Sequence, residues 1–414
     1  MTEEQNIPAN LQFLWSKEEY LRKRYPWAES YIYYYMNVAY VDWKEIPEVL
    51  DGVSEADRSR TDFEYMYAIF REYRKKKLNL AVVIPTYNRS EEIKFLLEYA
   101  APIYRIYGID IIIYDSSTDE RTCKYTNEIR ESGYFNVIYK RYNGVFDGFS
   151  LDHKIINAYN EFSDEYDYIW LCRDGLIPVI IEIIDKLIYY KKRGVDCIIV
   201  DTTSRTENLE IEKVYRSAED AESLLLEQAS RLQTLGMLIV SSSFAKKMIE
   251  TVPVDDSTYS LWQMAAPFHM FARKPYEIVF FTKKIFAANI KAKAAHFWGE
   301  KTLEQWARRW TMVIQGMPSC YDAVKKQCMM VYTVDFHPFC ARNILEMRAG
   351  GGLDRRIERK YEKYLPDVTF TPVWFFRFVS AVPKWVAKAF LKIADSHLDT
   401  VKRIRKRLIF DKRD

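Results

Sequence analysis

The sequence predicts a doubly wound α/β fold with a mostly parallel sheet. Three apolar stretches, Leu78–Ile84, Ile109–Tyr114 and Tyr168–Cys172, have the length and residue types of buried strands. Each runs into polar residues, and helical patterns separate the three. Because parallel strands end at one edge of such a sheet, these polar residues are expected to line a ligand site.

The alternation of strands and helices continues along the middle of the chain, from residue 78 to about residue 285. The predicted elements, in order after the first strand, are a helix from Ser90, the strand Ile109–Tyr114, a helix near 119–131, the strand Val137–Tyr139, a helix at 151–162, the strand Tyr168–Cys172, a helix at 178–192, the strands Asp196–Val200 and Gly236–Val240, and a helix near 243–251. Ser90 is expected to cap its helix, with Glu91 and Glu92 on the positive end of the helix dipole.

The sequence predicts helices on both sides of this α/β region. Residues 1–77 form a predicted N-terminal helical extension that ends in the basic run Arg74–Lys77, and residues 286–414 form a predicted C-terminal helical region. The predicted domains are therefore 1–77, 78–285 and 286–414. Aromatic residues make up 15% of the chain, which fits either sugar-stacking surfaces or an aromatic core, and the core is the more common use.

The sequence argues against a disordered, a secreted and a membrane-spanning protein. With 49% hydrophobic and 29% charged residues the chain is typical of globular proteins, and the six cysteines form no CxxC pair or regular framework. The polar, acidic start does not resemble a signal peptide, and no apolar run has the length of a membrane span. We therefore expect a reduced, cytoplasmic protein.

The loop after the first predicted strand reads Pro85-Thr86-Tyr87-Asn88-Arg89 and contains no glycine. Dinucleotide-binding folds and P-loop proteins both need a glycine-rich phosphate loop at this position. Both classes are therefore poor fits.

Three ordered motifs carry a resemblance instead: VVIPTYNR at 82–89, YDSSTDE at 114–120 and WLCRDG at 170–175. Their order and spacing resemble the inverting, nucleotide-sugar-dependent glycosyltransferases of family 2, which have the GT-A fold. The resemblance covers residues 78 to 285, about half of the chain. It implies a Rossmann-like catalytic domain that takes a sugar from a nucleoside diphosphate, with UDP as the expected nucleotide.

The resemblance also implies roles for individual residues. Asp115 matches the aspartate that accepts a hydrogen bond from the N3–H of uracil, a donor that cytosine lacks. Lys154, and after it His153, fall where a basic residue on a helix reaches the nucleotide. The residues that match the loop around the base and ribose are Pro85, Thr86, Tyr87 and Arg89.

Asp174 matches the last acid of the D-x-D segment, which in this family holds a divalent cation, Mn²⁺ or Mg²⁺, on the diphosphate. Here the chain departs from the pattern, because Cys172 replaces the first acid and Arg173 fills the middle position. Arg173 is therefore a second candidate for facing the phosphates. His296 lies where many such enzymes supply a further metal ligand, although a lone histidine near aromatic residues is more often packed in the core.

Structural roles compete with these assignments. Asp115 and Asp174 both stand in ordinary turn sequences, and His153 and Lys154 fit a solvated helix face. For Pro85 and Asn88, turn formation and ligand binding are about equally expected.

An inverting transferase needs a general base for the acceptor hydroxyl. In this family it follows a later strand and helix, at a place occupied here by Asp255 and Asp256. Asp256 is the preferred candidate, although acids before Ser257 and Thr258 also fit helix caps. Gln305–Trp310 (QWARRW) resembles the QxxRW segment of processive members with one residue too many, and is a candidate acceptor-site helix.

The C-terminal tail is basic, with 11 Lys and Arg against 4 Asp and Glu from Thr371 to Asp414. A helix from Pro383 would carry the apolar stripe Val386, Phe390, Ile393, Val401, Ile404 and Leu408, with lysines opposite and the aromatic residues Trp374, Phe375, Phe376 and Phe378 before it. Such a helix is typical of binding to an anionic membrane surface, and packing onto the body or another subunit is the alternative.

These observations predict a transferase on the inner face of the cell membrane that extends a glycan or a lipid-linked oligosaccharide for a surface polysaccharide. Its expected partners are the nucleotide sugar, that acceptor and the membrane, with an oligomer possible. Nucleic acid is not expected, because the tail has no aromatic–basic platform. The alternative is a relative that has lost catalysis and acts as a binding or scaffolding partner.

Overall fold

The computed structural model describes residues 9–37, 41–60, 62–145, 150–201, 211–283, 285–292, 299–336 and 338–393. The chain divides into two compact units, each built from three stretches. The first comprises Met1–Arg141, Glu165–Arg193 and Ile285–Asn289, and the second comprises Tyr142–Asp164, Gly194–Lys284 and Ile290–Asp414. The domain boundaries drawn from the sequence remain a prediction.

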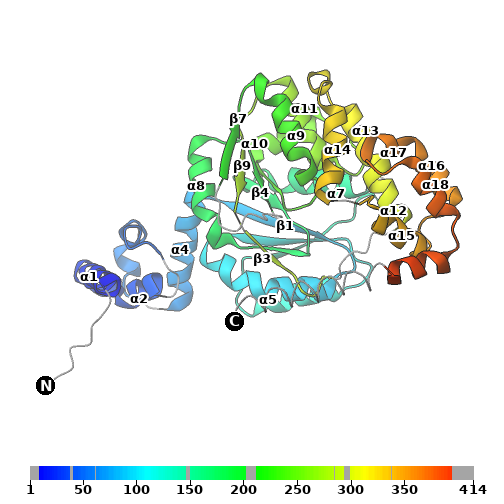
Figure 1. The fold of residues 1–414 in the computed structure, drawn as a ribbon. Coiled ribbons are helices and arrows are strands. Elements are labelled where there is room, and N and C mark those ends of the chain that lie inside the picture. The colour runs from blue at the N-terminus through cyan, green and yellow to red at the C-terminus, as the bar shows by residue number, and fades with distance from the viewer. Residues whose placement is uncertain are drawn as a thin grey trace, which may run out of the picture. The chain divides into compact units, whose positions relative to one another are not determined.

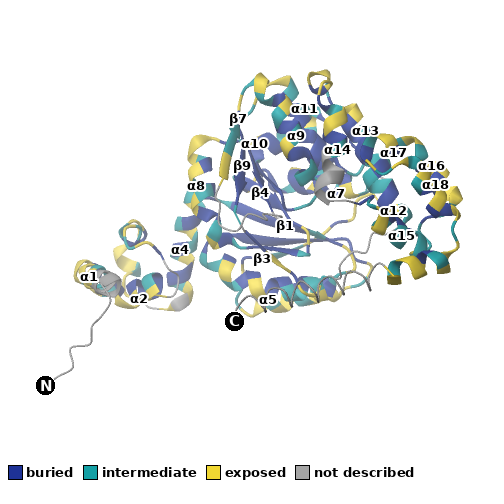
Figure 2. Cartoon of the chain, in the orientation of Figure 1, coloured by how far each residue is buried: buried dark blue, intermediate teal, exposed yellow. Residues whose placement is uncertain are grey.

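Within the described residues the main sheet has eight strands, and four of them lie in the first unit in the order β3-β2-β1-β4. All neighbouring pairs among these four are parallel. Nearly all residues of β1, β2 and β4 are buried, and Figure 2 colours buried residues dark blue, whereas β3 is only partly buried. The predicted α/β fold with a mostly parallel sheet is confirmed, with the strands β1 (Leu80–Thr86), β2 (Asp110–Asp115), β3 (Val137–Arg141) and β4 (Tyr168–Leu171).

The helices that follow these strands are α5 (Ser90–Ile106) and α6 (Arg121–Glu131), which pack against β2 and β3 (Figure 1). The predicted cap of α5 is wrong in one respect. Arg89 occupies the N-cap position, and Ser90 is a buried first residue of the helix. The acids Glu91 and Glu92 do lie in the first turn, where they face the positive end of the helix dipole.

The helix predicted at 178–192 begins later than expected. Leu176–Pro178 forms the strand β5, which pairs antiparallel with β10 (Phe286–Ala288). A 3₁₀ turn follows, and α8 runs only from Ile184 to Arg193. The pairing partner lies more than a hundred residues away, and the apolar run at 176–184 fits a strand or a buried helix equally well.

The N-terminal helices form a small aromatic core of their own. Tyr31, Tyr35 and Phe70 are buried in it, and the rings of Tyr35 and Phe70 lie 4.9 Å apart between centroids. The richness in aromatic residues therefore serves packing here, which is the more common use. The helices are α1 (Ala9–Arg24), α2 (Glu29–Asn37), α3 (Ile46–Leu50) and α4 (Phe63–Lys77).

In the second unit the strand order is β8-β6-β9-β7. The pair β6–β9 is parallel, and the pairs β6–β8 and β7–β9 are antiparallel. These strands are β6 (Cys197–Val200), β7 (Ile211–Tyr215), β8 (Leu238–Ser241) and β9 (Ile278–Thr282), and the helices beside them are α7 (Ser150–Phe162), α9 (Ala221–Leu232), α10 (Ser242–Thr251) and α11 (Trp262–Arg273).

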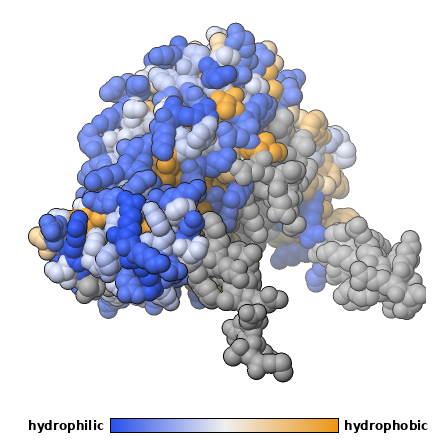
Figure 3. Space-filling model, turned by 90° about the vertical axis from the view of Figure 1, so that its left-hand side faces the viewer, coloured by the Kyte–Doolittle hydropathy of each residue, from blue (hydrophilic) through white to orange (hydrophobic). Residues whose placement is uncertain are grey.

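After β10 the described chain is helical, as predicted. None of the described helices combines the length and apolar composition needed to cross a bilayer. The face of the molecule drawn in Figure 3 is largely hydrophilic, with hydrophobic residues in a few small groups. The C-terminal helices are α12 (Glu300–Leu303), the π-helical turn η5 (Glu304–Arg309), α13 (Trp310–Gly316), α14 (Lys325–Phe336), α15 (Ala341–Gly350), α16 (Arg355–Tyr361), α17 (Leu365–Val368) and α18 (Val373–Ala381).

Candidate functional site

The carboxyl ends of β1 and β2 bring the first two motifs together. Thr86 and Asp115, the last residues of these strands, are partners in the parallel register. The Ser116 N–H donates to the Thr86 carbonyl at 3.1 Å, which extends the pairing by one residue. Pro85 and Thr86 therefore belong to the strand β1, whereas the sequence predicted them in the loop that follows it.

Asn88 joins the two loops that follow these strands. Its φ of 54° lies in the left-handed region, which asparagine tolerates better than most residues. Its Oδ1 accepts from the Thr118 N–H at 2.9 Å, and its own N–H donates to the Ser117 hydroxyl at 2.8 Å. Turn formation and ligand binding were both expected for Asn88, and the structure shows turn formation.

Asp115 is fully buried beneath these loops. Its Oδ1 accepts from the Ser117 N–H at 2.9 Å, and its Oδ2 accepts from the Tyr139 hydroxyl at 3.0 Å. Arg141 forms an ion pair with Oδ2 at 3.5 Å. A uracil N3–H could add a donor to this carboxylate only if Tyr139 or Arg141 moved.

Asp174 lies in the turn after β4 and is 7% exposed. Its Oδ1 pairs with the Arg89 guanidinium at 3.1 Å, and its Oδ2 lies 3.5 Å from the Thr86 hydroxyl. Burial raises the pKa of the Asp174 carboxyl, and Arg89 partly offsets that shift. Since Thr86 adjoins both acids, Asp115 and Asp174 lie at the same edge of the sheet.

Asn289, which the sequence did not single out, fixes the Asp174 turn. Its side-chain amide donates to the carbonyls of Glu92 and Asp174, both at 2.8 Å, and its N–H donates to the Gly175 carbonyl at 3.1 Å. The side chain is 3% exposed. The residue follows β10, so only the pairing of β10 with β5 brings it here, and no local sequence signal marks it.

Cys172 and Arg173 have opposite environments. Cys172 is fully buried, and burial raises the pKa of its thiol well above the ordinary value, so it is no substitute for a carboxylate. Arg173 is exposed. With Arg89 and Arg141 it places three guanidinium groups among two carboxylates at this edge.

The donor set in the described residues does not fit a resident divalent cation. No three His, Cys, Asp or Glu residues of the described ranges form a group that could hold a metal. Asp174 contributes one carboxylate, and Arg89 already neutralises it. His296, the other predicted metal ligand, lies outside the described residues.

Around these buried acids, Tyr87 and Arg89 stand exposed at the loop surface. Tyr87 is 54% exposed and the Arg89 side chain 41% exposed. An aromatic ring and a guanidinium at a strand-end edge can stack on a base and bind phosphate oxygens. The predicted donor-binding residues of the first unit therefore meet at one edge of the sheet with the predicted metal ligand Asp174. They are Pro85, Thr86, Tyr87, Arg89, Asp115 and Arg173.

In the second unit, Lys154 and His153 lie on α7. Lys154 is 6% exposed and its Nζ lies 5.7 Å from the centre of the Tyr142 ring, so it does not occupy a solvated helix face. His153 is partly buried. Contact of either residue with a nucleotide remains a prediction.

Asp152, also on α7, holds the loop that contains the candidate bases. Its two oxygens accept from the N–H groups of Ser260, at 2.5 Å, and Trp262, at 3.2 Å. Ser260 has a φ of 56°, a strained value for serine. Burial raises the pKa of Asp152 from 3.8 to about 7. No local sequence signal marks Asp152, because its partners lie more than a hundred residues away.

The two candidate bases differ in their contacts. Asp255 accepts at Oδ1 from the N–H and hydroxyl of Ser257, at 2.8 and 2.6 Å, so it shapes the turn. Asp256 is exposed and, among the described residues, makes no hydrogen bond or ion pair. The preference for Asp256 as a base is compatible with this geometry, and the role itself remains a prediction.

The structure accounts for the extra residue in the segment QWARRW. Glu304–Arg309 forms a π-helical turn, which holds one residue more than an α-helical turn. The insertion is absorbed there, so that Gln305, Arg309 and Trp310 keep the relative orientation of a QxxRW segment in a regular helix. Trp310 is nevertheless fully buried and donates to the Met329 carbonyl at 3.2 Å, so it forms core rather than a sugar platform.

Arg309 connects this turn to the loop of the candidate bases. Its guanidinium lies 4.4 Å from the centre of the Tyr259 ring, and its Nε pairs with Glu304 at 3.3 Å. The Tyr361 hydroxyl donates to the other oxygen of Glu304 at 2.9 Å. The candidate acceptor-site helix and the Asp255–Ser260 loop are therefore neighbours.

Comparison with known proteins gives no family assignment. No known family pattern matches the sequence, and no curated protein is similar to it. The structure is similar to TarS of S. aureus, with a TM-score of 0.41 and 11% identity over 73% of this chain. That alignment covers 55% of full-length TarS, and for TarS 1–349 the TM-score is 0.42, with 12% identity over 78% of this chain and 92% of that one.

A mannosyltransferase from Pyrobaculum calidifontis, solved with GDP-Man and Mn²⁺, gives a TM-score of 0.40, with 12% identity over 80% of this chain and 95% of the other. Glucosyl-3-phosphoglycerate synthase from Mycobacterium tuberculosis gives 0.37, with 13% identity over 63% and 86%. Because these scores and identities are low, we base the assignment of function on the residues of this chain. Membership of family 2 stays a prediction from the three motifs.

Proposed function

We propose that the protein is a glycosyltransferase that uses a nucleoside diphosphate sugar, with UDP as the nucleotide. One observation carries the proposal. Three arginines, Arg89, Arg141 and Arg173, lie at the carboxyl ends of parallel strands together with the buried acids Asp115 and Asp174, so guanidinium groups outnumber the buried carboxylates there. Guanidinium groups bind phosphate oxygens with paired hydrogen bonds, and this edge is where α/β sheets bind ligands.

In this proposal the arginines neutralise the diphosphate. Arg173 faces the phosphates, and Arg89, held in place by Asp174, binds beside it. Asp115 accepts from the uracil N3–H once Arg141 moves toward the ligand. The charge on the departing UDP is then carried by guanidinium groups, and no step depends on a metal ion.

The transfer itself is proposed to invert the anomeric carbon. Asp256 removes the proton of the acceptor hydroxyl as its oxygen bonds to that carbon, and the bond to the diphosphate oxygen breaks with its electron pair leaving on UDP. The exposure of Asp256 and its lack of partners among the described residues leave it accessible to an acceptor. Asp255 is the second candidate.

For the acceptor we propose a glycan or a lipid-linked oligosaccharide of a surface polysaccharide, reached at a membrane surface. A basic C-terminal region with exposed aromatic residues supports this choice. The role of the C-terminal helices in holding the acceptor, and any oligomer, belong to the same proposal.

A second function is favoured by one observation. The segment Cys172-Arg173-Asp174 keeps a single acid of the D-x-D pattern, which fits a relative that binds a partner without catalysis. The variant Asp174→Ala separates the two functions. If the protein is an enzyme, this variant should lose turnover while its fold stays intact. If the protein is a scaffold, the variant should still bind its partner.

The test is release of UDP or GDP when the purified protein is incubated with a panel of nucleotide sugars, with and without EDTA. We expect turnover with at least one UDP-sugar, a loss of about 100-fold or more in Asp256→Asn, and unchanged UDP affinity in that variant. The matched control is Asp119→Asn, an exposed carboxylate paired with Arg121. No turnover and no binding with any donor would contradict the proposal. Complete loss of turnover in EDTA would show that the predicted divalent cation is required.

A further inference from the structure

The described end of the chain exposes an unusual amount of apolar surface. Phe370, Trp374 and Trp385 are 72%, 64% and 72% exposed. Large exposed aromatic groups gathered in one segment mark an interaction surface. We call this surface the aromatic face, and it consists of Phe370, Trp374, Phe378, Trp385, Phe390 and Ile393.

Five of the six residues of the aromatic face lie on two helices, and Phe370 precedes the first of them. On α18, Trp374 and Phe378 stand one turn apart on the exposed side. In the following helix, residues 384–393, Trp385 and Ile393 share one side at a spacing of two turns. Lys384, Lys388 and Lys392 follow one another on the same helix at four-residue steps, about one turn each.

The opposite sides of both helices are packed, so the aromatic face belongs to an ordered structure. Phe376 and Val379 of α18 and Ala387 of the next helix are fully buried. Arg348 holds the connection between the helices, since its Nε donates to the Val382 carbonyl at 2.6 Å and its Nη1 to the Leu353 carbonyl at 2.9 Å.

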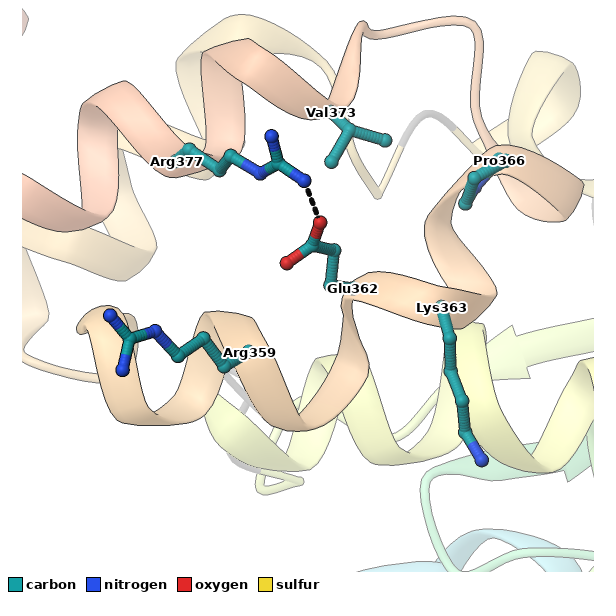
Figure 4. A pocket seen from close by; sticks show the side chains of 6 residues that line it. All are labelled: Arg359, Glu362, Lys363, Pro366, Val373 and Arg377. Atoms are coloured by element: carbon teal, nitrogen blue, oxygen red, sulfur yellow. Dashed lines mark hydrogen bonds and ion pairs between the residues drawn. The ribbon is translucent and has the colours of Figure 1, made fainter.

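A cavity of about 470 Å³ lies between α18 and residues 359–366 (Figure 4). Arg377 of α18 forms an ion pair with Glu362, while the Arg359 side chain points away from that pair. With Lys363 this gives three cationic groups to one acid. The cavity is lined by Arg359, Glu362, Lys363, Pro366, Val373 and Arg377.

Within the segment that carries the aromatic face every charged residue is a cation, and one of them, Arg377, is paired with Glu362 from outside the segment. Between Phe370 and Ile393 the sequence has no Asp or Glu and has four cations, Arg377 and the three lysines. A second copy of the same face would bring these cations against each other. An anionic surface would pair with them and take up the aromatic side chains at the same time.

We propose that the aromatic face docks the protein onto a bilayer that contains anionic phospholipid. Its tryptophans and phenylalanines enter the headgroup region and the lysines lie at the phosphates. Arg359 and Arg377 bind one lipid phosphate in the cavity once Arg377 leaves Glu362 and the Arg359 side chain turns toward it. This inference deepens the proposed membrane role by naming the surface and the lipid class, and it does not require turnover.

The experiment is flotation of the full-length protein with vesicles of phosphatidylcholine alone and of phosphatidylcholine with phosphatidylglycerol. We expect binding to the anionic vesicles to exceed binding to the neutral ones by about 10-fold or more. The double variant Trp374→Ala with Trp385→Ala should lose about 10-fold in affinity for the anionic vesicles. Arg359→Gln with Arg377→Gln should lose the preference for phosphatidylglycerol while keeping weak binding.

The matched control is Tyr99→Ser with Phe135→Ser, which removes two exposed aromatic side chains elsewhere. Circular dichroism and nucleotide-sugar turnover of each variant show that folding is intact. Wild-type protein that stays unbound, or tryptophan variants that bind like wild type, would overturn the proposal. So would a concentration-dependent dimer that the tryptophan variants abolish, because a second copy would then cover the face. Failure of turnover alone would count against the enzyme and not against docking.

Discussion

Cys172 and Arg173 change the charge of the candidate phosphate site. A D-x-D segment contributes two negative charges, which a divalent cation can balance next to a diphosphate. In this chain Asp174 and Arg173 sum to zero, and Arg89 adds a further positive charge. The local charge therefore favours direct binding of phosphate by arginine.

Arg173→Ala should weaken UDP binding by about 10- to 100-fold, because a charged hydrogen bond contributes roughly 1.5–3 kcal/mol. Arg173→Lys should recover part of the affinity, since lysine keeps the charge without the forked geometry. Isothermal titration calorimetry with UDP measures both. Arg121→Ala, which removes an exposed arginine at the start of α6, is the control, and equal Kd values for all variants would place the phosphates elsewhere.

Asp110 shows how a residue without a catalytic role fixes the N-terminal helices. It begins β2, is 2% exposed, and pairs with Arg71 and Lys75 of α4, both at 2.7 Å. The Tyr166 hydroxyl donates to the same carboxylate at 2.9 Å. The basic end of α4 is thus bound to the start of a core strand, a role that the charge pattern alone did not reveal.

Among the elements, those with a local signal were predictable. The strands β1, β2 and β4 are apolar runs followed by polar residues, and the helices after β1 and β2 begin near the predicted residues. The start of α8 was not predictable, because Leu176–Pro178 becomes a strand only through its pairing with β10. Asn289 and Asp152 were missed for the same reason, since their roles depend on partners that are distant in sequence.

The π-helical turn at Glu304–Arg309 leads to a test of the extra residue. Deletion of Arg308 should convert the turn to a regular α-helix and keep Trp310 in the core, at a cost of about 1 kcal/mol or less for the lost pair with Glu304. Deletion of Met312, in the α-helix that follows, should rotate Val313 and Ile314 out of the core and cost several times more. Urea unfolding of both variants measures the difference, and equal losses would contradict the assigned register.

Asp152 predicts a pH dependence of stability. Its folded pKa of about 7 lies above the ordinary 3.8, so the folded state holds the proton where the unfolded state has lost it. Its contribution therefore makes the free energy of unfolding fall as pH rises from about 4 to about 7, by roughly 4 kcal/mol. Asp152→Asn cannot ionise, but it keeps only one acceptor oxygen for the two N–H donors. It should therefore be less stable than wild type at pH 5 and lose less stability than wild type between pH 5 and pH 8 in urea unfolding. Parallel profiles for the two proteins would show that Asp152 is ionised in the folded state.

Each of the two units holds part of the proposed chemistry. The first carries the donor edge with Asp115, Asp174 and Arg173, and the second carries Lys154, Asp256 and the aromatic face. The three motifs predicted the donor edge because each ends a strand of one parallel sheet. The acceptor residues could be named only from the resemblance, and so their roles depend on experiment.

A crystal structure of the protein with UDP tests the central claim most directly. We expect the diphosphate within hydrogen-bonding distance of Arg173 and Arg89, with the uracil at Asp115 and Arg141 displaced from its ion pair. UDP bound away from the ends of β1, β2 and β4, or a crystal grown in saturating UDP with this edge unchanged and empty, would contradict it.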